Sequence, residues 1–308
     1  MSRYPIHPDF QKYEFTKVPL YPALLPAVQK AMTIGLARTP VPDGLSVREE
    51  AADGRVPVTV FAPAGLAAPA PCLVYFHGGA FALKAAPCHK RLACHYALET
   101  PCKVVFVDYR LLPRHPFPAG FEDCLAAYRW VVEQAQALGV DPTRIAVGGD
   151  SAGGALAARV CLAARDTGLP APCFQLLMYP ATDARMDTAS MRAYPDTPMW
   201  NARLNRKMWK LYLKNGDGGR RAYASPLEAA SFAGLPPTFV EVAQFDCLRD
   251  EGLALAHALE QAGVPVETRE VPGTIHGYDI ALDSAVTQDS VARRLAALRR
   301  AFARREEG

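Results

Sequence analysis

The segment AVGGDSAGGALAA places one serine among small residues, between a β-like run and a helix-like run. Glycine is unfavourable inside either element, so a steric reason must account for the small side chains. A sharp turn from strand to helix with Ser151 at its apex supplies that reason, because the neighbouring backbone segments then nearly touch. Gly149, Ala152 and Gly153 are small in this interpretation because nothing larger fits. Together with Asp150 they complete the G-x-S-x-G pattern of a nucleophile elbow, although an ordinary glycine-rich turn with a capping serine is the alternative.

A second motif, HGGA in the stretch VYFHGGAFALK, follows an apolar strand-like run. It is similar to HGGG-type motifs, whose backbone N–H groups help to form an oxyanion hole. Such donors matter because negative charge develops on a carbonyl oxygen when an acyl group is attacked, and loss of one donor can lower the rate ~100-fold. We expect His77 and Gly78 to support this loop, and His77 not to act as a base. A plain glycine turn is the alternative for this motif taken alone.

A serine nucleophile also needs a base and an acid that orients the base. With a nucleophile elbow, these are expected in the chain order Ser, then Asp or Glu, then His. Asp246 ends the apolar run TFVEVAQFD, and His276 follows the last strand-like run. Because parallel strands bring their carboxyl ends to one edge of a sheet, Ser151, Asp246 and His276 can meet there. Asp183, which also follows a strand-like run, is the alternative acid.

The other titratable residues fit these roles less well. Asp250 and Glu251 suit the first turn of the next helix, where acidic side chains favour the helix dipole. Four further histidines lie in helical, proline-rich or motif-free surroundings and are interpreted as structural or solvated, namely His7, His89, His115 and His257. Cys88 and His95 share a face of a helix, but two ligands do not make a metal site, so no metal is predicted.

Apolar runs alternate with helical segments along the chain. The strand-like runs are residues 72–77, 102–109, 144–150, 173–180, 238–246 and 266–271. Helical spacing occurs between them at residues 121–139, 152–168 and 251–263, and a hairpin with Asp53-Gly54 at its turn precedes the first run. Continuous apolar runs are typical of strands that are buried on both faces. We predict one α/β domain over residues 1–308, with a mostly parallel, doubly wound sheet and helices on both faces.

Two segments break the alternation of strands and helices. Residues 1–45 contain a helix-like stretch among prolines, and residues 183–222 follow a central strand-like run. We predict that these segments form a small helical cap; an elaborated surface loop is the alternative for the second. Four large side chains of the second segment are candidates for lining a substrate pocket or for forming the core of the cap: Trp200, Met208, Trp209 and Tyr212.

The composition argues against several classes of function. The 308 residues carry 34 Lys and Arg against 31 Asp and Glu, a net charge of +3. This balance gives no electrostatic footprint for nucleic acid or for an acidic membrane surface. The first residues lack the apolar core of a signal peptide, and no apolar run approaches the ~18 residues of a membrane span, so we expect a cytoplasmic protein. Most of the eight cysteines lie in or beside apolar segments and are expected to be reduced.

The motifs YFHGGAF, VDYRLLPRHPFPAG, GGDSAGG, LPPTFVEVAQFDCLRDEG and GTIHGYD occur in this order. With them, the chain resembles the hormone-sensitive-lipase-like branch of the α/β-hydrolase superfamily, which includes bacterial acetyl esterases and carboxylesterases. The resemblance implies a serine carboxylesterase that needs no cofactor and hydrolyses short-chain acyl esters through an acyl-enzyme. By position, Ser151 is then the nucleophile, Asp246 the acid and His276 the base.

The resemblance also implies that the backbone N–H groups of Gly79, Ala80 and Ala152 stabilise the oxyanion. Ala80 stands where a third glycine is more common. The substitution retains the N–H group, but an alanine at positive φ would cost ~1–2 kcal/mol.

Other functions are compatible with the same fold. A non-catalytic small-molecule receptor is one alternative, and an amidase or peptidase that uses the same triad is another. A small-molecule ester is the expected partner. A homodimer through edge-to-edge pairing of the last strand is compatible with the chain but is not required by it.

Overall fold

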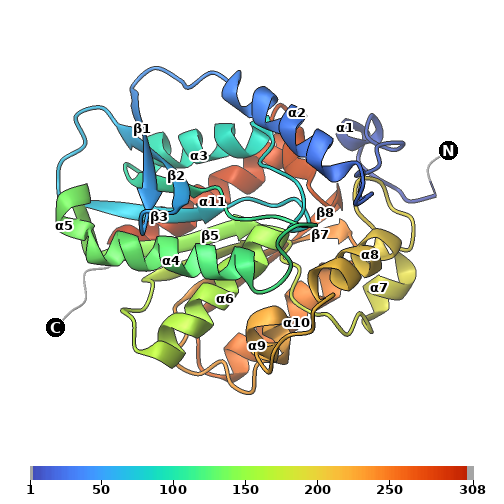
Figure 1. The fold of residues 1–308 in the computed structure, drawn as a ribbon. Helices are drawn as coiled ribbons and strands as arrows, with labels where there is room; N and C mark the ends of the chain where they lie inside the picture. The colour runs from blue at the N-terminus through green and yellow to red at the C-terminus, as the bar shows by residue number, and fades with distance from the viewer. Residues whose placement is uncertain (1–2, 304–308) are drawn as a thin grey trace.

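One sheet of eight strands runs through the molecule in the order β1-β2-β4-β3-β5-β6-β7-β8 (Figure 1). The structure is a computed structural model that describes residues 3–303; the outermost residues of the predicted domain, 1–2 and 304–308, lie outside the described part. The strands are β1 (Leu45–Ala52), β2 (Val56–Pro63), β3 (Ala70–Phe76), β4 (Lys103–Val107), β5 (Val140–Asp150), β6 (Phe174–Met178), β7 (Thr238–Phe245) and β8 (Val266–Ile275). β2 pairs in antiparallel fashion with β1 and β4, whereas all the other neighbours pair in parallel. The predicted hairpin and the mostly parallel sheet are therefore confirmed.

Helices cover both faces of the sheet (Figure 1). One face carries α3 (Pro87–Glu99) and α11 (Ala285–Ala303), and the other carries α4 (Ala119–Glu133), α6 (Ala152–Thr167) and α10 (Arg249–Gln261). Along β3, Cys72, Val74 and Phe76 belong to the core beneath α4 and α6. Leu73 and Tyr75 belong to the core beneath α3 and α11. The strand is buried on both sides, which explains why its sequence is a continuous apolar run.

The two segments predicted to form a cap contain several helices. These are α1 (Pro8–Gln11), α2 (Leu25–Ala37), α7 (Ala189–Ala193) and α8 (Ala202–Tyr212), with α9 (Arg221–Ala224) at the end of the second segment. Lys17 and Met199 form a parallel β-bridge between the segments. Arg3 forms an ion pair with Asp196 at 3.0 Å. The two segments are therefore in contact with each other, while their description as a helical cap stays a prediction.

Some boundaries differ from those predicted. β5 begins at Val140 and β8 continues to Ile275. β8 lies at the edge of the sheet, and its many exposed polar residues weaken the apolar signal on which the prediction depended. The predicted helix at 121–139 divides at Gln134 into α4 and α5 (Ala135–Leu138), and α3 was implied only by the spacing of Cys88 and His95. None of the described helices is both long and apolar enough to cross a membrane.

Candidate active site

The carboxyl ends of three parallel strands bring together the predicted nucleophile, base and acid. Ser151 follows β5, Asp246 follows β7 and His276 follows β8. His276 Nε2 lies 2.9 Å from Ser151 Oγ, and His276 Nδ1 lies 2.7 Å from Asp246 Oδ2. Asp246 is fully buried, and its Oδ1 accepts the N–H of Leu248 at 2.9 Å. This arrangement suits an imidazole that keeps a proton on Nδ1 and accepts a second proton through Nε2.

The turn at Ser151 has a strained backbone. Its φ of 54° and ψ of −117° are rare for a residue with a side chain. The N–H of Ser151 donates to the carbonyl of Met178 at 2.8 Å, and the carbonyl of Ser151 accepts the N–H of Ala155 at 3.1 Å. A β-carbon on Gly149 would lie 2.3 Å from the carbonyl oxygen of Phe76. The close backbone approach that the small residues predict is therefore present in the structure.

The loop after β3 carries two of the expected oxyanion donors. Among the described residues, no hydrogen bond uses the backbone N–H of Gly79, Ala80 or Ala152. Ala80 has a φ of 58° and Phe81 a φ of 56°. Ala80 thus adopts the left-handed conformation that costs an alanine ~1–2 kcal/mol. The loop turns back tightly on itself, since a β-carbon on Gly79 would lie 2.8 Å from the carbonyl oxygen of Leu83.

His77 lies beneath this loop and is fully buried. Its ring stacks on Tyr109 with 4.6 Å between centroids, and its Nδ1 donates to the carbonyl of Gly78 at 2.6 Å. The hydroxyl of Tyr109 in turn donates to the carbonyl of His77 at 2.7 Å. Burial, helped by the nearby His89, lowers the pKa of His77 to about 4. A neutral histidine held in this way agrees with its interpretation as a support for the loop.

Asp150 connects the elbow to the oxyanion loop. Its Oδ1 accepts the N–H of Gly78 at 3.0 Å and the hydroxyl of Tyr75 at 2.8 Å. Its Oδ2 lies 3.1 Å from Nε2 of His89. Burial alone would raise the pKa of Asp150, but His89, Tyr75 and Gly78 together hold it well below its ordinary value. A negative charge therefore lies directly before the candidate nucleophile.

A cavity of about 140 Å³ lies beside Ser151. Both predicted cap segments contribute to its walls, with Val18 and Met32 from the first segment and Met199 and Trp200 from the second. Of the four pocket candidates, only Trp200 is thus found in the lining.

The other three candidates are packed elsewhere. Met208, Trp209 and Tyr212 are buried on one face of α8 and are not part of this cavity lining. The ring of Tyr212 stacks on Phe81 with 4.2 Å between centroids, and its hydroxyl accepts a hydrogen bond from Arg159 at 2.6 Å. Their spacing places them on the face of α8 that packs against the α/β domain. These three side chains therefore occupy core positions, the alternative to the pocket that the sequence had left open.

His89 was interpreted as structural or solvated, and the structure favours the first of these. Its side chain is only 14% exposed, lines the cavity and contacts Asp150, so it is not solvated. The available signal was its place in the first turn of a helix that follows the oxyanion loop.

Asp183, the alternative acid, pairs with Arg185 at 2.9 Å. Within residues 3–303, no three His, Cys, Asp or Glu side chains gather as a metal site would require.

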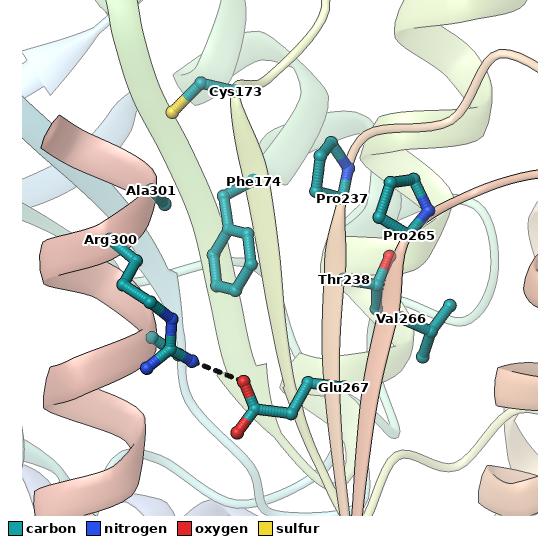
Figure 2. Close-up of a pocket in the computed structure, with 10 residues that line it drawn as sticks. Cys173, Phe174, Pro237, Thr238, Pro265, Val266, Glu267, Arg300 and Ala301 are labelled. Carbon is teal, nitrogen blue, oxygen red and sulfur yellow. Dashed lines mark hydrogen bonds and ion pairs between the residues drawn. The ribbon is translucent and has the colours of Figure 1, made fainter. Parts of the chain in front are cut away.

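A second pocket lies at the opposite ends of the strands from Ser151 (Figure 2). Phe174, Thr238 and Val266 begin β6, β7 and β8, so this pocket lies at the amino ends of the strands. The dashed line in Figure 2 marks an ion pair between Arg300 and Glu267 that neutralises both charges. The grouping of a nucleophile, a base and free backbone donors therefore favours the cavity at Ser151 as the active site.

Comparison with known proteins gives consistent matches. Residues 73–280 match a family model described as the alpha/beta hydrolase fold. The chain is 40% identical over 251 residues to the carboxylesterase NlhH of Mycobacterium tuberculosis, covering 80% of this chain and 79% of that one. A bacterial heroin esterase has a TM-score of 0.86 and 37% identity, covering 97% of this chain and 99% of its own. The esterase LipW from Mycobacterium marinum has a TM-score of 0.90 at 33% identity, covering 97% of each chain.

Proposed function

Because the chain belongs to the hormone-sensitive-lipase-like branch of the α/β-hydrolase superfamily and is a carboxylic ester hydrolase, we propose that it hydrolyses short-chain acyl esters through a Ser151–His276–Asp246 triad. The observation that carries the proposal is the pair of hydrogen bonds that His276 forms, at 2.9 Å to Ser151 and at 2.7 Å to Asp246. The first hydrogen bond aligns the Ser151 hydroxyl with the base, and the second fixes the base in place through its other nitrogen, Nδ1.

In the proposed reaction, Ser151 Oγ attacks the ester carbonyl carbon while His276 Nε2 takes the hydroxyl proton. The negative charge that develops on the carbonyl oxygen is stabilised by the backbone N–H groups of Gly79, Ala80 and Ala152. Collapse of the tetrahedral intermediate breaks the ester C–O bond, and His276 gives its proton to the leaving alcohol. A water molecule, deprotonated by His276, then attacks the acyl-enzyme and releases the carboxylic acid and free Ser151.

The size of the cavity supports a short acyl group. Its volume is about 140 Å³, and a cavity of about 150 Å³ in another protein holds a benzene-sized molecule. Such a volume suits acetyl to butyryl groups in the present arrangement of Met32, Met199 and Trp200. A long acyl chain would require these side chains or the segments that carry them to move apart.

The test is hydrolysis of p-nitrophenyl esters of increasing acyl length by the wild-type protein and by Ser151→Ala. We expect turnover of the acetate and the butyrate that falls for long chains. We expect Ser151→Ala to lower kcat by about 10⁴-fold or more while the protein stays folded, because the nucleophile is lost and no new side chain enters the elbow.

Turnover of esters by folded Ser151→Ala at the wild-type rate would refute the assignment of the nucleophile. Efficient cleavage of anilide substrates together with no ester turnover would favour an amidase. Preference for long acyl chains would contradict the argument from the cavity volume and leave the triad assignment intact.

A further inference from the structure

A histidine outside the proposed triad contacts the machinery around Ser151. His89 lies in the first turn of α3 and lines the same cavity as Ser151. Its Nδ1 accepts the N–H of Ala86 at 2.8 Å, so the neutral ring carries its proton on Nε2. That proton points to the Oδ2 of Asp150, 3.1 Å away. His89 is therefore held in one tautomer as a hydrogen-bond donor to a buried carboxylate.

Asp150 is the point at which two functional loops meet. It directly precedes Ser151, and it accepts the N–H of Gly78, which directly precedes Gly79. The contact is close, because a β-carbon on Gly78 would lie 2.1 Å from Asp150 Oδ2. One carboxylate thus sets the separation between the candidate nucleophile and the candidate oxyanion donors. Any rotation of this carboxylate moves the backbone of Gly78 or breaks its hydrogen bond.

His89 is the donor that fixes Oδ2 of this carboxylate. The two other donors, Gly78 and Tyr75, both bind Oδ1. Without a donor on Oδ2, a charged and almost fully buried oxygen loses its partner, and the carboxylate has to reorient or draw water from the cavity. Either change alters the position of the oxyanion loop, and a misplacement of about 1 Å in an active site can cost about 100-fold in rate.

We propose that His89 is a positioning residue for the ester hydrolysis, which holds the oxyanion loop in register with Ser151 through Asp150. The inference rests on the proposed function. A residue that only fills the wall of the cavity would behave differently, because its loss changes substrate binding and hence KM. Loss of the positioning contact lowers kcat, since the oxyanion donors act most strongly in the transition state.

The test compares two neutral amides at one position. In His89→Gln the side-chain nitrogen reaches the place of Nε2 and can still donate to Asp150. In His89→Asn the side chain ends near the place of Nδ1, so Asp150 Oδ2 has no donor. The control is His95→Asn, which changes an exposed histidine on the same helix. Four quantities are measured: kcat and KM with p-nitrophenyl acetate, the rate of inactivation by diethyl p-nitrophenyl phosphate, and the thermal midpoint.

We expect His89→Asn to lower kcat and the inactivation rate by about 10- to 100-fold, with KM changed by less than about threefold. His89→Gln should restore most of this loss, and His95→Asn should match the wild type. His89→Leu is the second donor-free variant should His89→Asn be recovered unfolded.

Equal kcat for His89→Asn, His89→Gln and the wild type would overturn the inference, as would a loss confined to KM or to the thermal midpoint. In those cases wild-type ester turnover remains, so the proposed function stands. Absence of ester turnover in the wild type itself would overturn the proposed function and this inference together.

Discussion

A β-carbon on Gly153 would lie 1.9 Å from the carbonyl oxygen of Phe76. Gly153 belongs to the first turn of α6, and Phe76 ends β3, the strand that leads into the oxyanion loop. The helix after the nucleophile and the strand before the oxyanion donors therefore touch backbone to backbone. Because the contact is between backbone atoms, no side chain can rotate away to make room. Only glycine therefore fits at position 153.

Gly153→Ala is expected to destabilise the protein by more than about 3 kcal/mol, the upper end of usual overpacking costs, because the clash is with backbone. The control is Gly35→Ala, which adds the same methyl group within α2, where no described atom other than the adjacent helix backbone lies within 4 Å. That control should leave the free energy of unfolding unchanged or raise it by up to about 1 kcal/mol through helix propensity. Urea unfolding of both variants measures the difference, and equal midpoints would contradict the steric account.

The elbow could be predicted from the sequence because its constraint is local. Gly149, Ser151 and Gly153 are neighbours in the chain, and their spacing alone expresses how closely the backbone must turn. Asp246 and His276 could be predicted because strands of a parallel sheet end at one edge. In each case a general rule of geometry connects the residue type with its place, without knowledge of distant side-chain packing.

Arg159 shows why the rest could not be predicted. It lies in the apolar run of α6 and is fully buried. Its guanidinium donates to the hydroxyl of Tyr212 and to the carbonyl of Ala224, each at 2.6 Å, and lies 4.9 Å from the ring centre of Phe81. These partners are an aromatic ring, a hydroxyl and a main-chain oxygen from distant segments. None of them is marked by a charge in the sequence, and the same applies to the inward packing of Met208 and Trp209.

Asp246→Asn is expected to lower kcat by about 10³- to 10⁴-fold while KM changes little. Asparagine keeps the shape of the side chain, but its amide can donate to Nδ1 of His276 and so favours the tautomer that cannot accept a proton through Nε2. The matched control is Asp183→Asn, which changes another buried aspartate after a parallel strand. Per folded molecule, the control should retain wild-type activity. A large loss in the control and a small one in Asp246→Asn would reverse the assignment of the acid.

Glu251 offers a test of stability against pH. It is fully buried in α10, and its Oε1 accepts the N–H groups of Thr182 and Asp183 at 2.5 and 3.2 Å. Its Oε2 has no hydrogen-bond partner among the described residues. Burial, with the nearby charge of Asp183, raises the pKa of Glu251 well above its ordinary value of 4.5. The folded protein therefore holds a proton here that the unfolded chain releases above that pH.

The titration of Glu251 should consequently lower the free energy of unfolding of the wild type as pH rises above 4.5. The decrease is up to about 1.4 kcal/mol per pH unit and continues until the folded-state pKa is reached. Glu251→Gln retains the Oε1 acceptor for Thr182 and Asp183 but cannot ionise, so this pH-dependent loss disappears. Urea unfolding at pH 5, 6, 7 and 8 should then show the variant gaining stability relative to the wild type until the folded-state pKa of Glu251 is passed. Parallel pH curves for the two proteins would mean that Glu251 is ionised in the folded state, with a donor supplied to Oε2 by water, and would contradict the protonated carboxyl.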